Sequence, residues 1–204
     1  MSQKKIGVFG GAFDPPHNAH VALAQTALTE LALDALHVIP TGQAWHKART
    51  LSPAEHRLAM TRLAFQNMPR VVVDDREIKR AGPTFTIDTL QALQVENAGA
   101  QLYLIMGADQ FAAFKQWHKW REIIKIAIIC IAGRARFDWA EGRFDAQNEL
   151  EGRTLTLQMP PMPVSATQIR QLLTGGLGEN QAIADLLPNP VASYIAQHQL
   201  YKAS

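Results

Sequence analysis

The sequence predicts an α/β fold, a doubly wound parallel sheet with helices on both faces. Short apolar segments alternate with longer amphipathic ones along most of the chain, and the apolar segments end at glycine, proline or polar residues. Consecutive parallel strands need a crossover connection, which the amphipathic segments can supply as helices. Ligands of such a sheet bind outside the carboxyl ends of its strands.

The first strand and the first helix are expected at the start of the chain. Ile6, Val8 and Phe9 suit a buried strand, and two glycines at 10 and 11 then permit a turn. A helix is expected from about Asn18, because apolar residues recur from there at helical spacing.

The later elements follow the same alternation. A second strand is expected at 35–39, ended by Pro40-Thr-Gly42, and Ser52-Pro-Ala-Glu55 predicts a capping box with proline at the first helical position. Residues 134–152 are expected to form an exposed loop or a frayed helix. The remaining strands are expected at 71–74, 101–106, 126–131 and 154–158, and the remaining helices at 86–95, within 109–124, after Ser165 and near 187–195.

Length and composition predict one domain, residues 1–204, on which a C-terminal helical segment of about 165–204 packs. The chain has 204 residues, 47% of them hydrophobic, which is enough for one substantial core. The net charge of +2 and the dispersed basic residues argue against a nucleic-acid partner and favour an acidic small molecule.

The chain shows no apolar signal region and no apolar stretch of about 20 residues, so we expect a cytoplasmic protein with no membrane partner. Its single cysteine, Cys130, lies in an apolar segment and is expected to be a core residue. The sequence leaves the oligomeric state open, a homo-oligomer included.

Candidate binding chemistry is concentrated in the run from Gly7 to His20. Gly10 and Gly11 allow backbone N–H groups to approach a phosphate closely. His17 and His20 lie in or just before the first turn of the expected helix, where they can point the same way. A helix N-terminus carries about half a positive charge, to which two imidazoles would add N–H donors. The run therefore predicts a nucleotide triphosphate site, with an ordinary βα unit and incidental histidines as the plainer alternative.

A second candidate phosphate site lies at Ser165, Thr167 and Arg170. A hydroxyl N-cap followed by an arginine near a helix start can hold an anion. A plain capped helix with a surface arginine would give the same pattern.

Together, these two segments resemble the signatures of the nucleotidyltransferase superfamily of adenylyl- and cytidylyltransferases. The first is similar to G-G-x-F-D-P-x-H-x-G-H, with Ala12 in place of a hydroxyl residue and Ala19 in place of glycine. The second is similar to I-S-S-T-x-I-R, with Val164 and Ala166 as mild substitutions. The resemblance implies a Rossmann-like sheet. It also implies that the ATP-binding residues are Gly10, Gly11, Ala12, Phe13, His17, His20, Asp109, Arg134, Ser165 and Arg170.

Three segments in the middle of the chain resemble those of bacterial nicotinate mononucleotide adenylyltransferases. Residues 76–90 are similar to E-x-K-R-x-x-P-S-Y-T-x-x-T-L, although alone they would read as an exposed charged strand end, a Gly-Pro turn and a helix start. Ile105-Met-Gly-Ala-Asp109 resembles I-x-G-x-D, and Phe114-Lys-Gln-Trp117 resembles F-x-x-W. The resemblance extends from Gly7 to about Leu200.

A pyridine carboxylate also suits these residues chemically. An aromatic face such as that of Trp117 stacks on a planar ring, worth about 0.5 to 1.5 kcal/mol beyond burial. N–H donors at a helix start near Thr84 favour a carboxylate. The resemblance implies that nicotinate mononucleotide contacts Thr84, Thr86, Trp117 and His118, and that Lys47 binds its phosphate. A structural aromatic at Trp117 and a solvated, flexible Lys47 are the alternatives.

The resemblance implies an enzyme of NAD biosynthesis that transfers the adenylyl group of ATP to nicotinate mononucleotide and releases pyrophosphate. His17, His20, Lys47 and Arg170 are the expected catalytic residues, because the reaction requires positioning and charge neutralisation but no nucleophilic side chain. Mg²⁺ is the expected cofactor, held by the ATP phosphates and water without a protein metal site. A nucleotide sensor without turnover and a pantetheine-phosphate adenylyltransferase are the alternatives.

Overall fold

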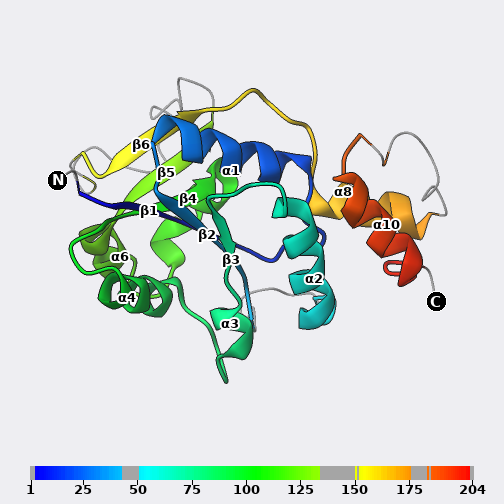
Figure 1. Ribbon diagram of the computed structural model, residues 1–204, viewed down its shortest axis with the longest axis horizontal. Helices are drawn as coiled ribbons and strands as arrows, with labels where there is room; N and C mark the ends of the chain where they lie inside the picture. Colours follow the sequence, from blue (N-terminus) through cyan, green and yellow to red (C-terminus); the bar gives the residue numbers. More distant parts are fainter. Residues whose placement is uncertain are drawn as a thin grey trace.

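The computed structural model describes residues 3–42, 51–133, 150, 152–175, 183 and 185–202. Six parallel strands form one sheet in the order β3-β2-β1-β4-β5-β6, which confirms the predicted doubly wound arrangement (Figure 1). The strands are β1 (Lys5–Gly11), β2 (Ala35–Pro40), β3 (Val71–Val73), β4 (Gln101–Gly107), β5 (Ala127–Gly133) and β6 (Thr154–Gln158).

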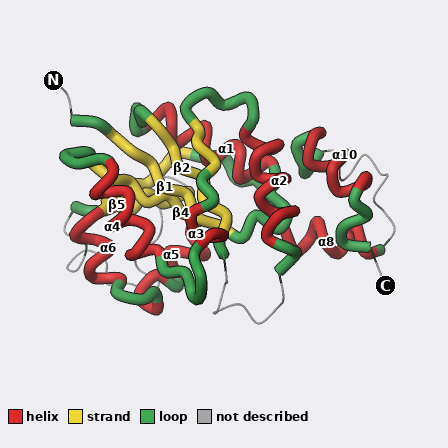
Figure 2. The backbone as a smooth tube through the Cα atoms, turned by 60° about the horizontal axis from the view of Figure 1, so that its bottom comes forward, coloured by secondary structure: helices red, strands yellow, loops and turns green. Residues whose placement is uncertain are grey.

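Helices cover both faces of the sheet, as the alternation of elements predicts. They are α1 (Asn18–Glu30), α2 (Ala54–Phe65), α3 (Arg76–Lys79), α4 (Thr86–Glu96), α5 (Ala108–Ala112), α6 (Trp120–Ile126), α8 (Ala166–Thr174) and α10 (Asn189–Gln197), with a 3₁₀ turn, η1, at Phe114–Gln116. In Figure 1, α1 lies on one face of the sheet, and α4 and α6 lie on the other. α2 stands at the end of the sheet, next to α8 and α10 (Figure 2).

The central strands are buried on both faces, because helices pack on both sides of the sheet and successive side chains point to opposite sides. In β1, Val8 packs against the α4 and α6 side, whereas Phe9 packs against the α1 side. Cys130 of β5 is fully buried on the α1 side, which confirms its predicted core position. Burial raises the pKa of its thiol to about 12.

A separate apolar cluster joins α2, α8 and α10. It contains Met60 of α2, Ile169 of α8, and Val191 and Ile195 of α10, all buried. The cluster fixes the segment that carries Arg170 beside the sheet rather than on either of its faces. In the described part of the chain, no helix is long and apolar enough to cross a membrane.

The structure corrects two local predictions. α2 begins at Ala54 with Pro53 at the N-cap and no capping side chain, so the capping box predicted at Ser52 does not form. The backbone N–H of Ser52 instead donates to the Asp14 carboxylate at 3.2 Å. The charged segment after β3 forms the short helix α3 rather than an exposed strand end, and its Glu77 is buried. The expectation for 134–152 falls almost entirely outside the described residues.

Candidate active site

The predicted site residues gather at the carboxyl edge of the sheet. The strand order changes direction between β1 and β4, where the crevice of a doubly wound sheet forms. Gly10 and Gly11 are the last residues of β1, paired with β2, rather than the turn that the sequence predicted. The segment from Ala12 to His17 follows β1, and Asp109, exposed in the first turn of α5, follows β4. These two predicted ATP-side segments therefore flank the same crevice.

His17 and His20 face each other at the start of α1. His17 is the N-cap residue and His20 is the third residue of the helix; their ring centroids are 3.7 Å apart, with 23° between the ring planes. The backbone N–H of His17 donates to Nδ1 of His20 at 3.1 Å. Because this nitrogen accepts, the neutral His20 ring carries its proton on Nε2. The pair is thus arranged as predicted, with an N–H donor on the second ring.

The His17 ring is buried and uncharged at neutral pH. Burial lowers its pKa from 6.5 to about 4, so the two stacked rings do not repel each other as cations. Among the described residues, its Nδ1 has no hydrogen-bond partner. A buried nitrogen of this kind is costly for the folded chain.

The burial of His17 predicts that the fold becomes less stable as the pH falls from about 6.5 to about 4. In this window the unfolded chain binds a proton that the folded chain does not, so protonation favours unfolding. The full shift corresponds to about 3 kcal/mol, and His17 contributes no pH dependence above about 6.5. Urea unfolding at pH 7, 6 and 5 measures the dependence of the unfolding free energy on pH. His17→Gln is the control, and its unfolding free energy should fall less as the pH is lowered. Equal slopes for the variant and the wild type would contradict the assignment.

The ring of Phe13 supports the histidine pair from behind. It is 1% exposed, and it makes edge contacts with His20 at 5.0 Å and Phe9 at 5.4 Å between centroids. Its backbone has a positive φ of 48°. The predicted ATP contact at Phe13 is therefore left to its backbone, while Gly10, Gly11 and Ala12 are not fully buried.

The second predicted phosphate segment lies against the first. Ser165 caps α8 by accepting the backbone N–H of Gln168 at 3.2 Å, as predicted. Arg170 donates to the backbone oxygen of Asp14 at 2.7 Å and to Thr167 Oγ1 at 3.1 Å. Arg170 thus contacts Asp14, which lies three positions before His17, although the two signatures are far apart in sequence.

Of the residues expected to bind the mononucleotide, Thr84, Thr86 and His118 lie at the start of α4. Phe85 is its N-cap and makes no side-chain cap, so the first-turn amides near Thr86 have no intrahelical acceptor. The rings of Phe85 and His118 lie 4.4 Å apart, which places the exposed His118 beside this helix start. Thr84 is buried, and Trp117 is half-buried against Phe114, with ring centroids 5.4 Å apart.

Gly42, in the loop after β2, packs closely against α3 and against Thr84, just before α4. A Cβ at Gly42 would lie 2.1 Å from the backbone oxygen of Glu77 and 3.1 Å from Thr84 Cγ2, so only glycine allows this approach. The Glu77 carboxylate accepts from Thr89 Oγ1 at 2.9 Å, which ties α3 to α4. Burial raises the pKa of Glu77.

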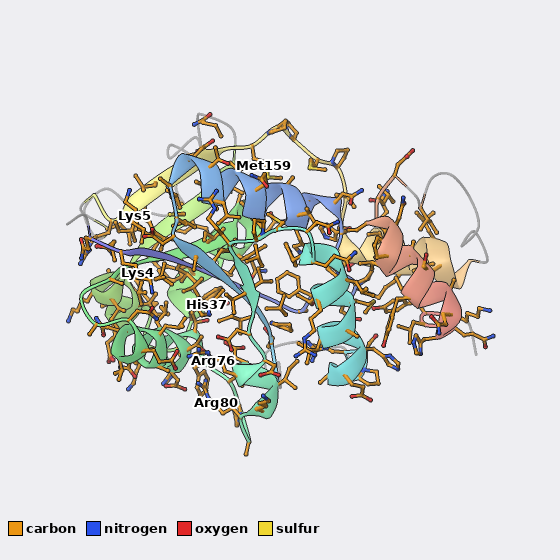
Figure 3. All side chains as sticks on the ribbon, in the orientation of Figure 1. Lys4, Lys5, His37, Arg76, Arg80 and Met159 are labelled. Atoms are coloured by element: carbon orange, nitrogen blue, oxygen red, sulfur yellow. The ribbon has the colours of Figure 1, made fainter. Side chains whose placement is uncertain are left out.

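An ion-pair network fixes the other side of α3. The Asp74 carboxylate accepts from Arg76 Nε at 2.7 Å and lies 3.0 Å from Nδ1 of His37, and Arg76 also binds Glu96 at the end of α4. Burial alone would raise the pKa of Asp74, but the hydrogen bonds from His37 and Arg76 outweigh it and lower the pKa to about 2. His37 and Arg76 are labelled in Figure 3. This network anchors the segment that leads to the start of α4.

Arg57 is a structural residue of the site that the sequence analysis missed. It is 2% exposed, and its guanidinium donates to the backbone oxygens of Ser52 at 3.0 Å, Ala12 at 3.0 Å and Thr41 at 2.7 Å. It therefore joins the loops after β1 and β2. The available signal was its spacing in α2, three residues before the buried Met60 on the same helix face.

A shallow apolar hollow at the ends of β5 and β6 was also missed. It has a volume of about 250 Å³, and Met159, labelled in Figure 3, is part of its wall. The lining residues are Ala132, Gly133, Met159, Pro160, Pro161 and Met162.

Two predicted residues cannot be placed in this site. Lys47 and Arg134 lie outside the described residues. In the part of the chain that the structure covers, no group of three or more His, Cys, Asp or Glu side chains could hold a metal ion.

Sequence comparisons show the family of the chain. The family model described as cytidylyltransferase-like matches residues 8–172. A protein of Albidiferax ferrireducens is 52% identical over 98% of this chain and 100% of its own length, and one of Herpetosiphon aurantiacus is 39% identical with the same coverage. Both are named "Probable nicotinate-nucleotide adenylyltransferase".

Solved structures share the fold. The nicotinic acid mononucleotide adenylyltransferase of Plasmodium falciparum complexed with NaAD has a TM-score of 0.79 at 19% identity, over 98% of both chains. The same protein complexed with APC has a TM-score of 0.78 at 20% identity. The six-stranded parallel sheet is therefore shared with proteins of very different sequence.

Proposed function

The chain belongs to the cytidylyltransferase-like family and, within it, to the nicotinate-nucleotide adenylyltransferases, and we propose that it makes nicotinate adenine dinucleotide and pyrophosphate from ATP and nicotinate mononucleotide. The observation that carries the proposal is the contact of Arg170 with the backbone of Asp14 at 2.7 Å. It supports the proposal because it brings the Arg170 guanidinium onto the loop that leads to the His17–His20 pair at the start of α1.

The chemistry follows from this set of donors. An oxygen of the mononucleotide 5′-phosphate attacks the α-phosphorus of ATP, a new P–O bond forms, and the bond to the leaving pyrophosphate breaks. The attacking phosphate is already an anion, so the protein needs only to align the reactants and neutralise the leaving group. His20 Nε2–H, Arg170 and the helix N-terminus supply donors for that charge.

Mg²⁺ enters this proposal with ATP, as part of the substrate. Magnesium keeps several waters and is usually bound through substrate phosphates and one or two carboxylates. The donors near the start of α1 are imidazoles, amides and a guanidinium, which suit phosphate oxygens rather than a cation.

The adenosine end is assigned to the other side of the crevice. Asp109, exposed in the first turn of α5 just after β4, is assigned the role of accepting from a ribose hydroxyl. The apolar hollow lined by Met159 and its neighbours suits the flat adenine ring. Arg134, next in sequence to Gly133 of that hollow, is assigned to ATP on the family resemblance alone.

The nicotinate end is assigned to the region between α4 and η1. The first-turn amides of α4, near Thr84 and Thr86, favour a carboxylate over a neutral carboxamide. Trp117 offers a half-buried aromatic face, and the ring of the next residue, His118, contacts Phe85 at the same helix start. Lys47 is assigned to the mononucleotide phosphate on the family resemblance alone.

Product analysis tests the proposed function. Purified protein with ATP, Mg²⁺ and nicotinate mononucleotide is expected to form nicotinate adenine dinucleotide and pyrophosphate in equal amounts. Omission of the mononucleotide is the control and should leave ATP intact. Binding of ATP without pyrophosphate release in the complete mixture would instead indicate a sensor, which the alanines at 12 and 19 make worth excluding.

A further inference from the structure

Asp14 connects three segments at the candidate phosphate site. It is 1% exposed and lies between the turn after β1 and His17. Its Oδ1 accepts from the Tyr201 hydroxyl at 2.6 Å, and its Oδ2 accepts from the backbone N–H of Ser52 at 3.2 Å. Its backbone oxygen accepts from Arg170 at 2.7 Å. Any movement of Asp14 would therefore shift the loop that leads to His17 relative to Arg170.

Tyr201, which follows α10, is held in place for this contact. Its backbone has a φ of 63°, a left-handed conformation that is rare for a bulky residue and requires support from surrounding contacts. Its backbone oxygen accepts from Thr174 Oγ1 at 3.1 Å, and Thr174 lies at the end of the helix that carries Arg170.

The Tyr201 hydroxyl is a donor at all ordinary pH values. Burial, followed by the negative charge of Asp14, raises its pKa well above the usual value. A phenol that donates to a carboxylate makes a strong, short hydrogen bond, which limits the carboxylate to one orientation.

We propose that Tyr201 is a positioning residue of the adenylyl transfer, which acts through Asp14 to align the His17 loop with Arg170. This inference rests on the proposed function. Tyr201 itself touches neither reactant in this account. Its loss should reduce turnover, because the donors for the leaving pyrophosphate lose their alignment, and should leave the mononucleotide site near α4 unchanged.

Tyr201→Phe tests the proposal, with Tyr194→Phe as a matched control. Tyr194 lies in α10, and its hydroxyl contacts Nδ1 of His56 at 2.9 Å, on α2. We expect Tyr201→Phe to lower kcat about tenfold and to leave the KM for nicotinate mononucleotide within about twofold. Tyr194→Phe should keep the wild-type kcat. Thermal unfolding of both variants controls for loss of folded protein.

A double-mutant cycle with Asp14→Asn shows whether Tyr201 acts through Asp14. If it does, Tyr201→Phe should change kcat much less in the Asp14→Asn background than in the wild type. Thr174→Val removes the hydroxyl that contacts the backbone oxygens of both Tyr201 and Arg170. It should give a smaller fall in kcat, and it serves if Tyr201→Phe does not fold.

Several results would overturn the inference. Equal kcat values for Tyr201→Phe and Tyr194→Phe would refute it, and so would independent effects of the two substitutions in the cycle. If Tyr201→Phe does not fold, a wild-type kcat for Thr174→Val would refute it. Each of these results would leave the proposed function intact. A wild-type protein that releases no pyrophosphate would overturn both.

Discussion

His20→Ala is expected to lower turnover about a hundredfold or more while the protein stays folded. The substitution removes Nε2–H, the donor directed at the leaving pyrophosphate in our account. His20 is only half-buried, and its ring meets Phe13 edge-on and lies at a tilt to Phe9, with centroids 5.9 Å apart. The loss should therefore appear in kcat more than in the stability of the fold.

His198→Ala is the matched control for this substitution. Its ring lies against Tyr194 and His56, at the contact of α10 with α2, away from the His17–His20 pair. It should keep the wild-type kcat. A second variant, His20→Asn, restores an acceptor for the His17 N–H without the Nε2–H donor, and it should remain as slow as His20→Ala. Recovery of turnover in His20→Asn would contradict the donor role.

Arg57→Met is expected to destabilise the fold by about 3 kcal/mol or more and to abolish most activity. Its guanidinium is buried and donates to backbone oxygens of Ser52, Ala12 and Thr41. Methionine keeps the apolar stem but leaves these oxygens without their donor, and buried acceptors without partners are costly. The loops after β1 and β2 would then lose their common support.

Urea unfolding of Arg57→Met measures this effect against Arg62→Met. Arg62 lies on the same helix, its side chain is 58% exposed, and it pairs with Asp75 at 3.4 Å. A surface pair of this kind contributes about 1 kcal/mol or less, so the control should remain close to the wild type. Similar unfolding free energies for the two variants would show that the Arg57 contacts do not support the loops.

The sheet could be predicted from the sequence because its strands are short apolar segments that end at glycine, proline or polar residues. β1 and β5 are largely buried on both faces, and strands of this kind consist of nearly continuous apolar residues, which a sequence shows directly. The start of α1 and the Ser165 cap are local features, determined by residues within one turn. The meeting of Arg170 with Asp14 was expected only from the two family signatures, because the loop and the helix are far apart in sequence.

The missed features depend on contacts between distant segments. Arg57 looks like an ordinary helix arginine until the loops after β1 and β2 close over it. Ser52 does not cap α2, because Asp14 takes its N–H and Pro53 occupies the N-cap. Tyr201 lies after α10 and belongs to no motif, and only the fold brings its hydroxyl to Asp14. No local pattern in the sequence contains this information.

The relative efficiency with two mononucleotides tests the central claim most directly. The kcat/KM for nicotinate mononucleotide and for nicotinamide mononucleotide can be measured with ATP and Mg²⁺ by continuous detection of pyrophosphate. The first-turn amides of α4 favour the carboxylate, so we predict a ratio of about ten to a hundred in favour of nicotinate mononucleotide. A ratio near one, or one that favours nicotinamide mononucleotide, would contradict the account.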